Sequence, residues 1–364
     1  MTPTDINSGV YKYIFNQYDY FDKDIFKFGF LTRNADALMK TAEYKKYGFS
    51  VHPFSSVQRD NPQALKREII DTLLEYDIIH LHTSSWRGFL IEEIAMEVGM
   101  NKVIVHSHST GIDVKNDFER EVQYKEHEKY KKAFSEKYAT DFCACSKKAA
   151  KWLFGDSISL EKVKILPNSI DTNKYAYSVE TRNNIRCEYG LDDCFVIGNV
   201  GRFSYTKNQA FLLSLMPDIL KIIPNAKLIL IGEGQNKQLL EKALEDQNLQ
   251  ENVIILDWVN NIQDYLCAMD IFCLPSLFEG FPISVIEAQT SGLPCIMSDR
   301  ITEEAEITCL ATRLPLLKER WIDMLVNLYE TKGDVERDKA FVQVQKSGFD
   351  VRDCAQKLVD LWKI

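Results

Sequence analysis

The chain has 364 residues, which is more than one ordinary hydrophobic core holds and suits about two domains. Its 45% hydrophobic and 27% charged residues predict a globular protein rather than a disordered one. The formal net charge of -9 argues against a general nucleic-acid binder, and no uninterrupted apolar run reaches the roughly 18 residues of a membrane span.

Cysteine usage and the N-terminal sequence favour a cytoplasmic protein. Most of the nine cysteines lie in apolar surroundings, as expected of buried, reduced thiols. Cys143 and Cys145 form a C-x-C pair, but no second pair follows at the spacing of a zinc finger. The first residues, MTPTDINSGV, lack the apolar core of a signal peptide.

Strand-like apolar runs alternate with amphipathic, helix-like stretches along the chain. In the first half we expect strands at 26–32, 47–52, 76–83, 101–109 and 140–145. In the second half we expect them at 194–203, 226–234, 252–259, 270–276 and 293–299. Such alternation is typical of parallel sheets that are covered by helices on both faces.

Two sets of strands predict an α/β protein with two doubly wound, Rossmann-like domains that face a cleft. We place the first domain at residues 1–170 and the second at 171–364, with a hinge in the polar stretch 172–184. Ligands of open parallel sheets bind at the carboxyl ends of the strands. Polar side chains fall at these ends, namely His80, His82, His106, His108, Arg202, Glu233 and Glu279.

The segment GNVGRFSYTKNQ has the residues of a diphosphate site. Gly198 and Gly201 close an apolar strand, Arg202 stands at its end, and Lys207 follows where a helix is expected to begin. Small residues allow close backbone approach, and two cations suit a diphosphate. The alternative is a surface turn with two solvated charges.

The segment EGFPISVIEAQTSG is the strongest single signal in the chain. It places Glu279 and Glu287 on either side of a strand-to-helix turn, with Pro282 at the expected first helical turn. The N–H groups of Phe281, Ile283 and Ser284 could face an anion, and Glu287 could accept two hydroxyl hydrogen bonds, as a ribose diol offers. Alternatively, Glu279 only favours the helix N-terminus and Glu287 lies on a solvated face.

Two other patterns could suggest a metal. His80 and His82, like His106 and His108, alternate along an expected strand, so each pair shares one face. Zinc is one reading, but acidic ligands are not evident, and hydrogen bonding to a ligand or to neighbours is the favoured one. The D-x-D at Asp22–Asp24 matches a metal-binding pattern, but it reads as a solvated turn.

These segments together resemble the retaining glycosyltransferases of the GT-B fold, family four, and most closely the bacterial members that build capsular or exopolysaccharide. The matching pieces, in order, are HSHST, LPNSID, GNVGRF…KNQAFLL, AKLILIGEG, LFEGFPISVIEAQTSGLPCIMSD and RITEEAEIT. The spacing from Glu279 to Glu287 is that family's E-x7-E motif. The resemblance covers nearly the whole chain and implies that the last helix crosses back to the first domain.

The resemblance implies a role for each matching position. Arg202 and Lys207, beside Gly201, match the cations that bind the donor diphosphate. Glu287 matches the carboxylate that holds the ribose, and Glu279 matches the one that contacts the transferred sugar. The backbone that would touch sugar or phosphate is that of Gly280, Phe281, Pro282 and Ile283. 

In the first domain the resemblance implies two further positions. His108 matches the histidine near the reacting carbon, with His106 as the fallback, and Gly9 matches a glycine loop near the donor phosphates. The family usually has an apolar strand before that loop, whereas only MTPTDIN and Ser8 precede Gly9 here. Either the start of this sequence is truncated or misplaced, or the first strand of this domain is missing.

The resemblance implies that the protein is a cytoplasmic, metal-independent hexosyltransferase without a cofactor. It would move a sugar, with retention, from a nucleotide diphosphate sugar to a saccharide or lipid-linked saccharide acceptor in surface polysaccharide biosynthesis, and the expected donor is a UDP-sugar. Peripheral contact with the inner membrane face is left open, and no nucleic-acid partner is expected. Two alternatives are a sugar-nucleotide epimerase of the same fold and a catalytically silent nucleotide-sugar-binding subunit that supports a partner enzyme.

Overall fold

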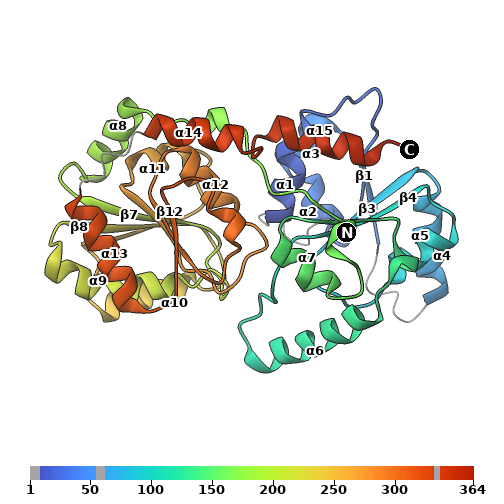
Figure 1. Cartoon of the computed structure of the whole chain (residues 1–364), viewed down its shortest axis with the longest axis horizontal. Coiled ribbons are helices and arrows are strands. Elements are labelled where there is room, and N and C mark those ends of the chain that lie inside the picture. Colours follow the sequence, from blue (N-terminus) through green and yellow to red (C-terminus); the bar gives the residue numbers. More distant parts are fainter. Residues whose placement is uncertain (1–8, 55–61, 332–336) are drawn as a thin grey trace. The chain divides into compact units, whose positions relative to one another are not determined.

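The computed structural model describes residues 9–54, 62–331 and 337–364 (Figure 1). The chain divides into two compact units. The first unit comprises Met1–Ile112, Phe118–Ser169 and Val351–Ile364, and the second comprises Asp113–Asp117 and Ile170–Asp350. Among the described residues, no helix combines the length and the apolar character that a membrane crossing requires.

The described strands of the first unit are paired in parallel. One sheet has the order β3(Ile78–Thr83)-β4(Lys102–Ser107)-β5(Asp141–Ala144)-β6(Val163–Ile165), and β1(Gly29–Thr32) pairs with β2(Ser50–Pro53) in another. The helices are α1(Gly9–Tyr18), α2(Ala35–Met39), α3(Ala42–Tyr47), α4(Pro62–Leu73), α5(Leu90–Glu97), α6(Asp117–Ala133), α7(Lys147–Phe154) and α15(Val351–Trp362), with the short turns η2(Glu136–Tyr138) and η3(Leu160–Lys162). The place of the first strand that the family usually has falls before Gly9, outside the described residues.

Helix α15 belongs to the core of the first unit. Its Leu358 and Leu361 are buried in one cluster with Tyr13 of α1 and Ile104 of β4. The amphipathic spacing of DVRDCAQKLVDLW explains this packing, because its apolar residues recur every three or four positions. Helix α6, by contrast, buries only His127 among its described side chains, as expected of a solvated amphipathic helix.

The described strands of the second unit form one six-stranded parallel sheet. Its order is β12(Ala311–Leu314)-β11(Cys295–Ser298)-β10(Ile271–Leu274)-β7(Phe195–Val200)-β8(Ala226–Ile231)-β9(Val253–Leu256). The helices are α8(Val179–Tyr189), α9(Gln209–Ile222), α10(Lys237–Asp246), α11(Ile262–Ala268), α12(Ile283–Thr290), α13(Lys318–Glu330) and α14(Arg337–Lys346), with the turns η4(Thr172–Tyr175) and η5(Glu303–Ala305). All described strand pairs in both units are parallel, so the predicted α/β class is confirmed.

The strand order of the second unit contains a topological switch point. From β7 the chain builds outward through β8 and β9, and then returns to the other side of β7 with β10, β11 and β12. The segments that follow β7 and β10 therefore leave neighbouring strands in opposite directions. In an open α/β sheet, this is where a ligand is expected to bind.

Candidate functional site

Both motifs singled out in the second half of the sequence lie at this switch point. The segment with Arg202 and Lys207 follows β7, and the segment with Glu279 follows β10. Lys207 Nζ donates to Glu279 Oε1 at 2.7 Å, and Ser276 Oγ donates to the same oxygen at 2.7 Å. The lysine and glutamate side chains are only 20% and 12% exposed, so Lys207 is not the solvated charge of the alternative reading.

Backbone hydrogen bonds and amide side chains tie the two loops together. Leu277 N donates to Thr206 O at 2.7 Å, and Asn208 Nδ2 donates to Pro275 O at 3.2 Å. Within the strands themselves, buried Asn199 of β7 donates to Cys273 O of β10 at 2.8 Å. The position of Lys207 relative to Glu279 is therefore fixed by the backbone as well as by the ion pair.

Two glycines bring the loop after β8 against the loop after β7. Gly232 has φ +156°, and a Cβ there would lie 2.1 Å from the carbonyl oxygen of Gly201. Gly234 has φ +146°, and a Cβ there would lie 2.4 Å from the carbonyl oxygen of Phe203. Any side chain at either glycine would push the loop that carries half-buried Arg202 out of place.

Helix α12 carries the second carboxylate of the motif. Pro282 directly precedes the helix, and Glu287 lies within it at 2% exposure. The reading of Glu287 as a solvated face is therefore wrong. Tyr175 Oη donates to Glu287 Oε1 at 2.8 Å. Burial first, and then the nearby Glu287 carboxylate, raise the pKa of Tyr175, so its phenol remains a hydrogen-bond donor.

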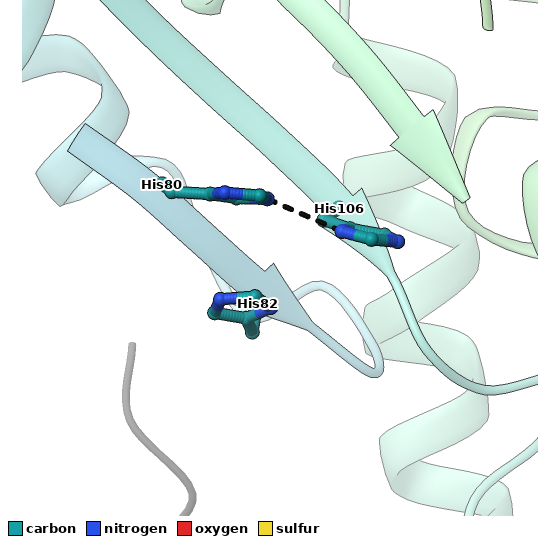
Figure 2. Close-up of side chains that lie close together, drawn as sticks. All are labelled: His80, His82 and His106. Atoms are coloured by element: carbon teal, nitrogen blue, oxygen red, sulfur yellow. Dashed lines mark hydrogen bonds between the residues drawn. The ribbon is translucent and has the colours of Figure 1, made fainter. Parts of the chain in front are cut away.

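Four histidines of the first unit, His80, His82, His106 and His108, form a cluster on β3 and at the end of β4. Figure 2 shows three of them, His80, His82 and His106. His80 Nε2 and His106 Nδ1 are 3.2 Å apart, and His82 Nδ1 and His108 Nε2 are 2.9 Å apart. Trp362 of α15 donates its indole N–H to His80 Nδ1 at 3.3 Å. Burial lowers the pKa of His80 and of His108 to about 3 and holds the pKa of His82 and of His106 well below the ordinary value of a histidine, so all four rings are neutral near pH 7.

Three of these rings have the spacing of a metal site, since nitrogens of His80, His82 and His106 lie within 4.8 Å of one another. The hydrogen bonds oppose that use. An indole N–H can only donate, so His80 Nδ1 accepts and its Nε2 carries the hydrogen that is donated to His106. A protonated Nε2 has no lone pair for a metal, so His80 and His106 are arranged as a hydrogen-bonded pair and not as metal ligands.

The remaining positions named from the sequence are less informative. Gly9 is the exposed first residue of α1, and no described atom lies within 4 Å of where its Cβ would be. His108 is half-buried and lies against Tyr13, with 4.9 Å between the ring centroids. Asp22–Asp24 is an exposed turn in which Asp24 N donates to Asp22 Oδ1 at 2.9 Å, as expected for that segment.

The sequence interpretation did not single out Tyr175, Ser276 or Asn199. Tyr175 lies in a stretch whose composition indicated only a loop, and a single tyrosine there carries no signal of its own. Ser276 stands three residues before Glu279, and that spacing could have suggested a loop contact. Asn199 interrupts an apolar strand, so a buried polar side chain that needs a partner was the available signal.

Comparison with known proteins gives consistent findings. Residues 181–313 match the family described as "Glycosyl transferases group 1". The chain is 30% identical over 359 residues to "Putative glycosyltransferase EpsF" of Bacillus subtilis (strain 168), which covers 96% of this chain and 92% of that one. It is 29% identical over 233 residues to the Escherichia coli "UDP-Gal:alpha-D-GlcNAc-diphosphoundecaprenol alpha-1,3-galactosyltransferase", 62% of this chain and 58% of the relative. Its fold is similar to that of Anabaena Alr3699/HepE, crystallised in complex with UDP, with a TM-score of 0.76 at 16% identity over 97% of this chain and 96% of that one.

Proposed function

The chain belongs to the group 1 glycosyltransferases, with the GT-B fold, and we propose that it transfers a sugar from a UDP-sugar, with retention, to a saccharide or lipid-linked saccharide acceptor. The family and fold implied by the motifs are thereby confirmed. The name of the Escherichia coli relative supports the finer part of the proposal, because it gives UDP-Gal as donor, a diphosphoundecaprenol-linked sugar as acceptor and an alpha linkage. We place this reaction in surface polysaccharide biosynthesis, at the cytoplasmic face of the membrane.

The observation that carries the proposal is the pairing of Lys207 with Glu279 at the switch point, 2.7 Å apart. An ammonium in this place can bind the donor diphosphate, and Arg202 from the same loop adds a second cation. The first amide groups of α12 have no helical carbonyl partner, so they and the helix dipole favour an anion there. Glu287 then holds the ribose hydroxyls, and Glu279 contacts the sugar that is transferred.

The chemistry follows from these positions. The bond between the anomeric carbon and the diphosphate oxygen breaks, and negative charge develops on the leaving group. Lys207, Arg202 and the start of α12 stabilise that charge from fixed positions. The acceptor hydroxyl forms the new bond on the face that the diphosphate leaves, and its proton passes to a diphosphate oxygen. We propose that His108 of the first unit acts near the reacting carbon, as the resemblance implies. We propose that no divalent metal takes part.

The test is a transfer assay with purified protein, a panel of UDP-sugars and a bacterial extract of lipid-linked saccharides as acceptors. We expect one donor to yield UDP together with a glycosylated lipid, and nuclear magnetic resonance to show the same anomeric configuration in donor and product. Glu287→Gln should abolish transfer. Release of free UDP without acceptor would favour the epimerase, and UDP-sugar binding without turnover would favour the silent subunit.

A further inference from the structure

Tyr175 makes a contact that links two distant parts of the second unit. It is the last residue of η4, and its phenol donates to Glu287 of α12, 112 positions further along the chain, at 2.8 Å. Glu287 is 2% exposed. Carboxylates that bind a ligand are usually oriented by hydrogen bonds from neighbouring groups. The phenol is therefore a candidate for a group that sets the orientation of this carboxylate.

Other contacts fix the segment that carries Tyr175. Thr172 Oγ1 donates to Asp350 Oδ2 at 2.5 Å, and Gln345 Nε2 donates to Thr172 Oγ1 at 3.2 Å. The backbone adds a bond from Ile170 N to Phe349 O at 3.1 Å. The turn η4 is thus anchored to α14 and to residues that follow it, so the phenol has a fixed place beside α12.

The hydrogen bond suits a binding carboxylate. A carboxylate offers about four acceptor positions, and one bond from a phenol leaves enough for the two hydroxyls of a ribose. A bond from a neutral donor to an ionised acceptor is stronger than one between neutral groups. It also selects one rotamer of a glutamate side chain, which otherwise has three rotatable bonds.

We propose that Tyr175 is a positioning residue for donor recognition, which orients Glu287 so that its carboxylate meets the 2′ and 3′ hydroxyls of the donor ribose. This rests on the proposed function, which assigns the ribose to Glu287. A purely structural role would be different, because the phenol would then only satisfy a buried carboxylate. The two roles differ in whether Tyr175 affects the discrimination between a ribose and a 2′-deoxyribose.

The experiment compares the binding of UDP and 2′-deoxy-UDP by isothermal titration calorimetry. The variants are Tyr175→Phe, Glu287→Gln and the double variant. Tyr177→Phe is the matched control, because Tyr177 lies two residues away and its ring lies 4.3 Å from the guanidinium of Arg337. Wild-type protein and the control should bind UDP at least roughly tenfold more tightly than 2′-deoxy-UDP.

In Tyr175→Phe this preference should fall to roughly twofold, because UDP loses the bonds of two hydroxyls to Glu287 and 2′-deoxy-UDP loses only that of its 3′ hydroxyl. Glu287→Gln should also lose the preference, and adding Tyr175→Phe to it should lower the preference no further. An equal loss for both nucleotides, or an unchanged preference, overturns the positioning role. If circular dichroism shows that Tyr175→Phe is unfolded, Glu287→Gln provides the test. A full preference for UDP over 2′-deoxy-UDP in that variant then overturns the role. A wild-type protein that binds no nucleoside diphosphate overturns the proposed function itself.

Discussion

Replacing Glu279 by glutamine should separate donor binding from sugar transfer. The substitution keeps the size of the side chain and leaves it able to bond Ser276 and Lys207, but it removes one negative charge. We expect Glu279→Gln to bind UDP about tenfold more tightly than the wild type and to transfer sugar about a hundredfold more slowly. The carboxylate is thus predicted to oppose diphosphate binding and to favour the reaction.

The magnitude follows from the ion pair. Lys207 Nζ lies 2.7 Å from Glu279 Oε1, and a phosphate oxygen on the far side of the ammonium would lie about 2.8 Å from the nitrogen. The phosphate and the carboxylate would then be about 5.5 Å apart, which gives a repulsion of about 3 kcal/mol at an effective dielectric constant of about 20. Water and ions screen part of this, and we expect about 1.4 kcal/mol, or tenfold in Kd, to be measured.

Calorimetry with UDP measures the first effect and a transfer assay at saturating donor measures the second. Glu241→Gln is the matched control, because it removes the same charge from a more exposed pair, in which Lys237 Nζ lies 3.9 Å from Glu241 Oε1. Weaker or unchanged UDP binding in Glu279→Gln would refute the reasoning. Equal tightening in the control would show that only the net charge of the protein matters.

Three further predictions concern the charges and the histidines. Arg202→Ala and Lys207→Ala should each slow transfer about a hundredfold with unchanged circular dichroism, and the wild type should stay active in excess EDTA. This would be contradicted if EDTA abolished transfer, magnesium restored it and Lys207→Ala remained active. His108→Ala should lower turnover more than donor affinity, and a strong loss in His106→Ala with unaffected His108→Ala would move the role to His106. Burial lowers the pKa of His80 from 6.5 to about 3, so the unfolded state binds the extra proton below pH 6.5. The free energy of unfolding should therefore fall from pH 6.5 toward pH 3, by at most about 1.4 kcal/mol per pH unit for this ring. Urea titrations at several pH values should show that this free energy depends less steeply on pH in His80→Gln than in the wild type.

The fold class and the place of the donor motifs could be predicted because they depend on local patterns. Apolar runs of strand length gave the order of strand and helix, and parallel pairing places the carboxyl ends of neighbouring strands at one edge. Two short strands, β6(Val163–Ile165) and β12(Ala311–Leu314), were not predicted. The first has three residues with Lys164 at its centre, and the second contains Thr312 and Arg313, so neither has a continuous apolar run.

The histidine cluster shows a different limit of the sequence. Alternation correctly predicts that His80 and His82 share one face of a strand, but it does not give the register with the next strand. In the structure, His82 is the register partner of His106, while the hydrogen bonds run diagonally, from His80 to His106 and from His82 to His108. The donor that fixes the hydrogen on His80 comes from Trp362, which no local pattern connects to β3.

The burial of Glu287 depends on chain that lies far from the motif. Its helix α12 packs against both η4(Thr172–Tyr175) and α14(Arg337–Lys346). Gly292 permits this approach, because it has φ +70° and a Cβ there would lie 2.4 Å from the Cα of Arg337. On an isolated helix the same glutamate would be a solvated charge, and the E-x7-E spacing alone does not exclude that reading. The covering segments make it a carboxylate held in one orientation, so the specificity of the motif depends on residues that its spacing does not include.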